Sequence, residues 1–271
     1  MNHAYIISMT CGLYTYLSLA KLLFLTTYDS RLTTFHKGEI TMKLTVLGKY
    51  GPYPKAGTGA TSGYLLEADG ETIMLDMGSG TLARLQAATD IRKLSVIYIS
   101  HLHFDHTSDL LPLRYLLDDL GVTVNVITQY EDSDWYRTLF ASPRFNVINI
   151  DACTELKMGG LKLTFYEMKH PARDYAIRVE GEKTFVYTGD TVLCDELYRA
   201  ADGADCVLCG CAKPAGFKGP HMAGDDAVKF AEQTGVKIIA THFAPSFDAE
   251  KDMPKHENIL LAEEGKTYYI N

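Results

Sequence analysis

A dense group of metal-binding residue types follows one apolar run, and this stretch constrains the chain more than any other. The run from Val96 to Ser100 predicts a buried strand that ends at a loop. His101-Leu102-His103-Phe104-Asp105-His106 comes directly after it. Imidazole nitrogens and carboxylate oxygens are the ligands of zinc and similar divalent ions, and a strand end can hold such side chains rigidly. The pattern therefore predicts a metal site, and a histidine-rich polar turn is the alternative.

Length and charge limit the classes of protein that fit. The 271 residues could form one large α/β domain or two small ones. With 26 basic and 34 acidic residues the net charge is -8, which argues against a broad nucleic-acid-binding face. The six cysteines show no disulfide-framework spacing, and most lie in apolar runs as buried thiols would. We therefore expect a reducing compartment and a cytoplasmic protein.

Residues 1–41 differ from the rest of the chain. From Ala4 to Thr27 the only charge is Lys21, so the length would allow a membrane span. The basic start of a secretory signal is missing, however, and Met42 leads straight into a strand-like run. We expect 1–41 to be an N-terminal extension that is not part of the functional protein and 42–271 to be its single domain. A membrane anchor is the alternative for 1–41, and stable membrane association is not expected.

Strand-like and helix-like segments alternate after Met42, which predicts an α/β sandwich. Two strands joined across Asp69-Gly70 extend an antiparallel meander at the start of the domain. The Gly- and Pro-rich loop from Gly48 to Ser62 either borders the site or is a plain surface connection. No linker divides the chain after Met42. Expected strands are 43–48, 63–68, 71–76, 96–100, 122–128, 145–150, 155–158, 161–168, 175–180, 184–188, 206–209 and 237–241; expected helices end near 88 and span 109–120, 135–140, 194–201 and 224–233.

In the second half, polar side chains again follow predicted strands. His170 follows the strand ending at Met168, Asp190 follows the one ending at Thr188, and His242 follows the one ending at Thr241. A scaffold delivers functional side chains rigidly at such boundaries. One metal-binding motif supplies too few ligands for two ions, so these three residues are its natural completion.

The order of these motifs resembles the metallo-β-lactamase superfamily. The residues that carry the resemblance are His101-x-His103-x-Asp105-His106, Lys169-His170-Pro171, Tyr187-Thr188-Gly189-Asp190-Thr191 and Ala240-Thr241-His242-Phe243. The resemblance covers about 42–271. Pro220-His221-Met222-Ala223-Gly224-Asp225-Asp226-Ala227, followed by Thr241-His242-Phe243, is similar to the ribonuclease Z and cyclic phosphodiesterase branch, which acts on phosphodiesters.

The resemblance implies a fold and a ligand set. The fold would be a four-layer αββα sandwich of two mixed sheets with helices outside. His101, His103 and His170 would bind one metal, and Asp105, His106 and His242 the other, with Asp190 bridging. Two divalent ions, zinc or manganese, would activate a water and neutralise charge on a phosphoryl oxygen.

Three further residues are candidates for catalysis or substrate binding. His221 ends a Gly- and Pro-rich loop and could donate a proton to the leaving alkoxide, or it could be an ordinary residue before a helix. Asp105 could orient the water as well as bind metal. Lys213 and Lys218 flank a short loop before His221 and could hold a phosphate, or they could be solvated surface lysines.

Two departures from the branch shape the functional expectation. Ribonuclease Z enzymes usually carry a tRNA-binding arm between the positions matching His170 and Asp190, but only the 19 residues 171–189 intervene here. Related enzymes commonly have a Glu near the end of the strand that reads Cys209-Gly210-Cys211-Ala212 in this chain, so the resemblance does not extend to their proton-handling network. The two cysteines could bind a third ion, although a pair of buried thiols is favoured.

The leading hypothesis is hydrolysis of a small or nucleotide-type phosphodiester. A lactone or amide hydrolase on the same scaffold is the alternative, because an activated water can also attack a carbonyl. A ribonuclease Z-type endonuclease, with tRNA as partner, is less favoured. A redox role would need a diiron site and usually a flavin partner domain. The sequence leaves open whether the chain forms a homodimer.

Overall fold

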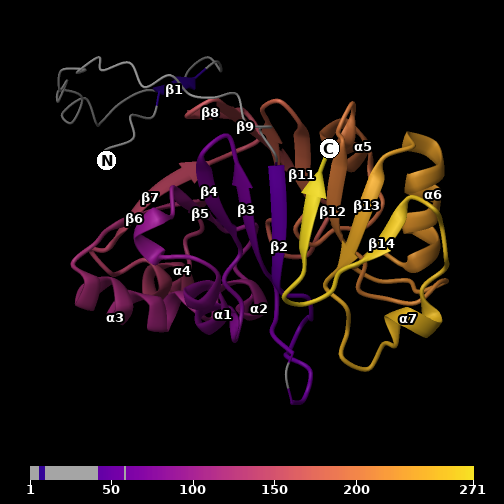
Figure 1. The fold of residues 1–271 in the computed structure, drawn as a ribbon, viewed down its shortest axis with the longest axis horizontal. Coiled ribbons are helices and arrows are strands. Elements are labelled where there is room, and N and C mark those ends of the chain that lie inside the picture. The colour runs from indigo at the N-terminus through magenta and orange to yellow at the C-terminus, as the bar shows by residue number, and fades with distance from the viewer. Residues whose placement is uncertain (1–5, 10–41, 58) are drawn as a thin grey trace.

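Two mixed β-sheets face each other in the computed structural model, which describes residues 6–9, 42–57 and 59–271 (Figure 1). In one sheet the strand order is β15-β2-β3-β4-β5-β6-β7, and in the other it is β1-β8-β9-β10-β11-β12-β13-β14. The first sheet contains β2 (Met42–Gly48), β3 (Gly63–Ala68), β4 (Glu71–Leu75), β5 (Val96–Tyr98), β6 (Val124–Gln129), β7 (Phe145–Ile150) and β15 (Thr267–Ile270). The second contains β1 (Ile6–Met9), β8 (Thr154–Met158), β9 (Leu161–Glu167), β10 (Tyr175–Glu180), β11 (Thr184–Tyr187), β12 (Cys206–Gly210), β13 (Lys237–Thr241) and β14 (Ile259–Leu261).

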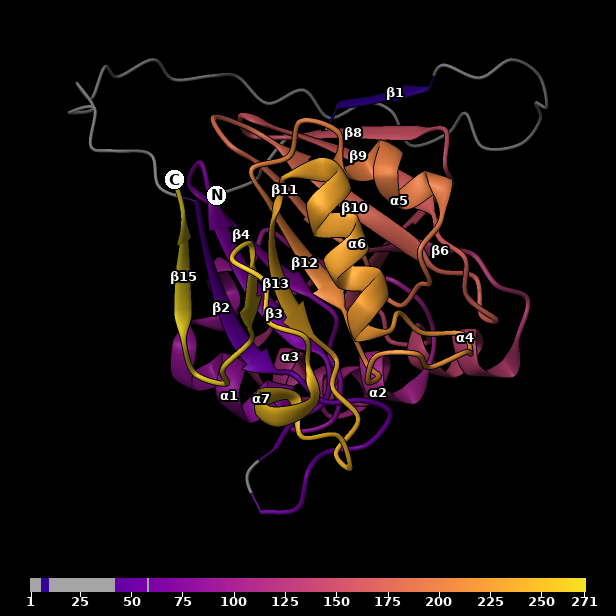
Figure 2. The ribbon, with the colours of Figure 1, turned by 90° about the vertical axis from the view of Figure 1, so that its right-hand side faces the viewer.

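Helices cover the outer face of each sheet. The first sheet is covered by α1 (Thr81–Ala88), α3 (Leu110–Leu120) and α4 (Asp134–Leu139), and the second by α5 (Asp195–Ala201) and α6 (Gly224–Thr234). Figure 2 shows α6 lying across β12 and β13. Short turns of helix are η1 (Ile91–Lys93), α2 (Phe104–Thr107) and α7 (Ala249–Asp252). The four-layer αββα sandwich expected from the sequence is confirmed.

Three apolar clusters fill the three spaces between these layers. The cluster between the sheets joins residues such as Leu44 and Leu66 to Phe165 and Leu208. A second cluster packs the other side of β12 and β13 on α5 and α6, and a third packs β5 and β6 on α1 and α3. Because the central strands are buried on both faces, their sequences are almost continuously apolar. This explains why Val96 to Tyr98 and Cys206 to Leu208 lack an alternating pattern.

In both sheets, the carboxyl ends of parallel strands lie next to the candidate site residues. Strands β4 to β7 run parallel in one sheet, and β11 to β14 run parallel in the other. Hydrogen bonds between side chains and the facing sheet join the two sheets near these strand ends. The Tyr64 hydroxyl lies 2.9 Å from Thr241 Oγ1, and the Tyr98 hydroxyl donates to the carbonyl of Tyr175. The carboxyl ends of β5, β11 and β13 therefore deliver their following residues to one place.

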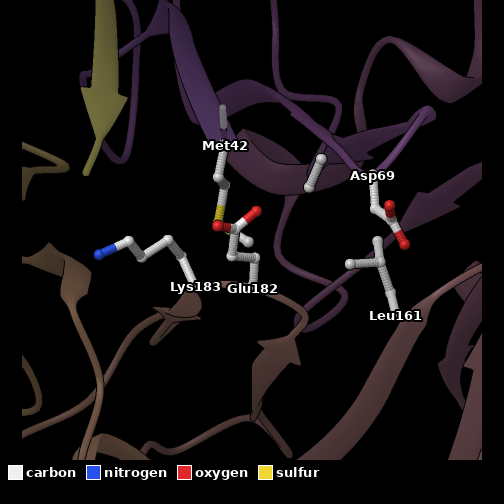
Figure 3. A pocket seen from close by; sticks show the side chains of 6 residues that line it. Met42, Asp69, Leu161, Glu182 and Lys183 are labelled. Atoms are coloured by element: carbon white, nitrogen blue, oxygen red, sulfur yellow. The ribbon is translucent and has the colours of Figure 1, made fainter. Parts of the chain in front are cut away.

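Two hairpins meet at the far end of the sandwich. A Cβ on Gly160, between β8 and β9, would lie 1.6 Å from Asp69 Oδ2, in the turn between β3 and β4. Figure 3 shows the adjoining cavity, lined by Met42, Asp69, Leu161, Glu182 and Lys183 together with Ala68. Its volume of about 10 Å³ holds no more than a water molecule. This cavity is therefore too small for a substrate.

Most predicted elements are confirmed within one or two residues, but six were missed. They are the short helical turns η1, α2 and α7 and the strands β1, β14 and β15. The apolar run of β14 has three residues and lacks alternation, so only its pairing with β13 and the pairing of β15 with β2 define them. The prediction that 1–41 is a separate extension falls largely outside the described residues, where only Ile6–Met9 is placed, antiparallel to β8. It stays a prediction.

No helix among the described residues is long and apolar enough to span a membrane.

Candidate metal centre

The structure brings the seven predicted ligands together in two groups. In the first, ligand atoms of His101, His103, His170 and Asp190 lie within 4.8 Å of one another. In the second, those of Asp105, His106 and His242 do the same. Asp190 Oδ2 also lies 3.6 Å from His106 Nε2 and 3.3 Å from His242 Nε2, so its carboxylate faces both groups.

The end of β5 positions the first half of the site. The chain leaves β5 at Tyr98, and His101 points inward, fully buried. His101 Nε2 lies 2.9 Å from His103 Nδ1, which in turn lies 3.3 Å from His170 Nε2. His103 is exposed and His170 is half-buried, so this group opens toward solvent. The turn of α2 then directs Asp105 and His106 into the interior.

The second group is buried throughout. His242 follows β13 with a backbone φ of +58°, a left-handed conformation that turns its ring back toward the site. Its Nε2 lies 3.0 Å from Asp105 Oδ2. A Cβ on Gly51 would lie 2.1 Å from the same Nε2 atom, so only glycine fits there. The loop from Gly48 to Ser62 therefore borders the site, which settles the choice left open by its composition.

Two buried carboxylates that the sequence did not single out hold the histidines in place. Asp76, after β4, lies 2.6 Å from His106 Nδ1 and accepts hydrogen bonds from the Ser100 amide, the Ser100 hydroxyl and the Tyr187 hydroxyl. Asp174, before β10, lies 2.7 Å from His101 Nδ1 and accepts a hydrogen bond from the Asp190 amide at 2.9 Å. Each carboxylate leaves the Nε2 atom of its histidine pointing at the centre, as in metal sites where an outer carboxylate orients a ligand.

The seven side chains suit a divalent cation, because several of their buried polar atoms lack any protein partner. His106 Nε2 and Asp190 Oδ1 are buried without a hydrogen bond inside the part of the chain that the structure describes. Unpaired buried polar atoms are costly, so native proteins rarely keep them. Nitrogen and oxygen donors that converge in this way match the preferences of zinc and related ions.

Burial and neighbouring charges shift the pKa values of two candidate catalytic residues. Burial raises the pKa of Asp105, but the adjacent His106 and His242 outweigh it and lower the pKa to about 2. Burial lowers the pKa of His221 to about 4 against the opposing effect of Asp190. Asp105 is therefore a carboxylate and His221 a neutral imidazole near pH 7 in the metal-free protein.

His221 lies at the rim of the two groups. Its Nδ1 atom is 3.5 Å from Asp190 Oδ2, and its ring stacks on His242 with centroids 5.5 Å apart. Ligand atoms of Asp190, His221 and His242 also lie within 4.8 Å of one another, so His221 is placed where it could face a metal or a substrate.

The two lysines differ in their surroundings. The backbone of Lys213 forms an isolated β-bridge with Ala223, and its ammonium lies 5.3 Å from the Phe217 ring centroid. The positive charge of Lys213 also contributes to lowering the pKa of His221. Lys218 is on the exposed part of the same loop. The structure thus places Lys213 near the candidate centre and gives no contact that ties Lys218 to it.

Gly210 ends the strand in which related enzymes commonly carry a glutamate, and it has no room for a side chain. A Cβ on Gly210 would lie 2.8 Å from the Gly189 carbonyl oxygen and 3.4 Å from Asp190 Oδ1. Cys209 and Cys211 flank it and are fully buried, and the Cys209 thiol lies 3.5 Å from Met222 Sδ. The prediction that these two thiols are buried is confirmed.

Known proteins share this fold and these motifs. A family model described as a beta-lactamase superfamily domain matches residues 71–243. The chain is 30% identical over 239 residues to the probable metallo-hydrolase YhfI of Bacillus subtilis, covering 84% of this chain and 94% of that protein. The crystal structure of YhfI superposes with a TM-score of 0.79 at 27% identity, covering 85% of this chain and all of that one. The ribonuclease Z of Ignicoccus hospitalis is 24% identical, covering 79% of this chain and 91% of that protein.

Proposed function

Because the chain belongs to the metallo-β-lactamase superfamily of metallo-hydrolases, we propose that it hydrolyses a small or nucleotide-type phosphodiester with two divalent metal ions. The observation that carries the proposal is the sharing of Asp190 between two groups of donors, with distances from its Oδ2 of 3.9 Å to His101 Nε2 and 3.3 Å to His242 Nε2. Two adjacent cations would supply Lewis acidity and an activated water.

The proposed ligand set follows the two groups. His101, His103 and His170 would hold one ion, and Asp105, His106 and His242 the other, with Asp190 between them. The imidazole-rich donor set suits zinc and also accepts manganese. Asp76 and Asp174 would fix the orientation of the two most buried histidines, which keeps the site preorganised.

His221 and Lys213 are the proposed contributors to phosphoester chemistry. His221 is neutral in the metal-free protein, and the negative charge of a bound phosphate would raise its pKa and so allow proton donation to the leaving oxygen. The Lys213 ammonium adds positive charge beside the same ring. A phosphodiester fits these groups better than a lactone, because a neutral ester has no charge for them to match.

A tRNA substrate is disfavoured by the loop that would have to bind it. Residues 171–189 consist of a short loop followed by β10 and β11, so no tRNA-binding arm is inserted there. The net charge of -8 gives no general attraction for RNA.

The test uses the full chain loaded with zinc or manganese and assayed on bis-p-nitrophenyl phosphate, a cyclic nucleotide panel, an acyl lactone and a precursor tRNA. We expect turnover of phosphodiesters and its loss in His242→Ala. His256→Ala, a histidine outside both groups, is the matched control. Two bound metal equivalents without turnover of any phosphodiester would overturn the proposal, and lactone turnover alone would favour the carbonyl-hydrolase alternative.

A further inference from the structure

An exposed aromatic side chain stands inside the metal-binding motif itself. Phe104 lies between His103 and Asp105, and 66% of it is exposed to solvent. Exposing so much apolar surface costs free energy on the order of 25 cal/mol per Å² relative to burial. The neighbours of Phe104 in the motif turn inward or toward the other histidines, whereas its ring remains outside the core. Its ring is therefore open to solvent at a position next to His103 in the chain.

The position of Phe104 is fixed by a tryptophan from another element. The rings of Phe104 and Trp135 meet edge to face, with centroids 4.8 Å apart and planes at 87°. Trp135, on α4, donates a hydrogen bond from Nε1 to the Leu102 carbonyl at 3.0 Å. The tryptophan is thus bonded to the main chain of the motif, and the pair forms a rigid edge-to-face unit beside His103.

A second aromatic pair involves the same helix, α4. Tyr130, which is 54% exposed, meets Tyr136 of α4 with centroids 5.2 Å apart. The preceding residue, Gln129, donates to the Arg173 carbonyl at 2.6 Å, which links this segment to the loop after His170. The segment that carries Tyr130 is thus joined to the loop after His170, a residue of the half-exposed donor group.

We propose that Phe104 and Trp135 form a stacking platform for the nucleobase of a nucleotide-type phosphodiester. The inference rests on the proposed function and deepens it, since it selects a nucleotide over a simple alkyl diester. Bases stack on exposed aromatic rings largely regardless of their identity, and loss of one such ring weakens binding by roughly 5- to 100-fold. Phe104 is adjacent in sequence to two proposed metal ligands, His103 and Asp105. A base stacked on its ring would therefore be held next to the phosphate of the same nucleotide.

The only tryptophan of the chain is Trp135, so its fluorescence reports directly on the platform. The experiment titrates the metal-loaded full chain with adenosine 5′-monophosphate and, separately, with ribose 5-phosphate. Wild type should show saturable quenching with the nucleotide and at least fivefold weaker binding of the sugar phosphate. Phe104→Leu, which keeps an apolar side chain but removes the ring, should raise the Kd for the nucleotide by about 5- to 100-fold.

Tyr115→Leu is the matched control, because Tyr115 is a similarly exposed aromatic (68%) on α3, where it contacts Arg114. It should bind the nucleotide as wild type does. Metal content measured in all three proteins shows that the motif is still loaded. Equal Kd values for wild type and Phe104→Leu, or equal binding of the nucleotide and the sugar phosphate, would overturn the platform.

Turnover separates this inference from the proposed function. The measurement compares kcat/KM for adenosine 3′,5′-cyclic phosphate with that for the cyclic phosphate of 1-O-methylribose, which lacks the base. A preference for the base that disappears in Phe104→Leu supports both proposals. Equal rates on the two compounds overturn the platform alone, and base-dependent quenching without any phosphodiester turnover overturns the proposed function alone.

Discussion

The two donor groups differ in how far solvent reaches them. In the first group His103 is exposed and His170 half-buried, whereas Asp105, His106 and His242 of the second are all buried. Both groups share the Asp190 carboxylate. Under the proposed function, substrate would enter from the half-exposed side, next to the proposed platform of Phe104 and Trp135, and the buried side would hold its ion more tightly.

The outer carboxylates repeat this contrast. Asp76, beside the buried group, accepts hydrogen bonds from three protein donors as well as facing His106. Asp174, beside the half-exposed group, leaves Oδ1 without a hydrogen-bond partner among the described residues, and burial together with the Asp190 charge raises its pKa well above the ordinary value. Among the described residues, both oxygens of the Asp76 carboxylate are thus hydrogen-bonded, whereas the Asp174 carboxylate keeps one oxygen unpaired.

Removal of metal should give the largest effect and test the contrast directly. Treating the two-metal protein with a chelator should release one ion quickly and one slowly, and full removal should lower kcat/KM by about 10³-fold or more, because Lewis-acid stabilisation is worth several kcal/mol. Metal content and activity are followed together over time. His103→Ala should lack the fast phase, while His256→Ala should keep both; a single phase in wild type would show that the groups are equivalent.

Substitution of Asp76 or Asp174, the carboxylates that orient His106 and His101, should have an effect of intermediate size. Asp76→Asn and Asp174→Asn should each weaken metal binding by about 10- to 100-fold, since such partners orient the ligating histidine. Competition with a coloured chelator measures both affinities. Asp174→Asn should weaken only the fast-releasing ion, and Asp76→Asn only the slow one. Loss of both ions from either variant would mean that the two networks act as one.

The smallest of the expected effects is the pH dependence that His221, at the rim of both groups, gives to the free energy of unfolding. Its pKa of about 4 in the folded protein lies below the ordinary value of 6.5, so between these pH values the unfolded chain binds more protons than the folded one. The free energy of unfolding of the metal-free protein therefore falls as pH decreases from about 6.5 to 4. The contribution is about 1–2 kcal/mol after allowing for the solvent that reaches this ring.

Thermal unfolding of the metal-free chain at pH 7 and pH 4.5 checks this expectation. His221→Asn should lose less stability than wild type between the two pH values, with His256→Asn as the matched control. An equal loss in His221→Asn and wild type would show that solvent already reaches the His221 ring freely.

The sequence predicted the parts of the fold and site that have a local signal. The apolar runs of β5, β12 and β13 and the histidine-rich motif could be recognised from their own residues. Asp76 and Asp174 could not, because a single aspartate near a strand end resembles a capping residue. The partners of Asp76 are 24, 30 and 111 residues away in the chain. One local signal did exist for Asp76, since it is the first residue of Asp76-Met77-Gly78 after a buried strand.

Tertiary structure also decided which uncharged positions matter. Gly51, Gly78 and Gly210 looked like ordinary loop and strand glycines, but a Cβ at each would lie within 2.8 Å of residues around the centre. Phe104 looked like a spacer between ligands until its exposure and its contact with Trp135 were known.

The sequence by itself determined the candidate ligands, their order and the strands that deliver them, because the potential to bind metal and to form strands depends on residue chemistry and short-range pattern. Only the tertiary structure decided which ligands face solvent, which carboxylates orient them and which aromatic rings border them. These properties depend on distances between residues far apart in the chain, such as Tyr187 and Asp76, which become neighbours only when the two sheets pack together.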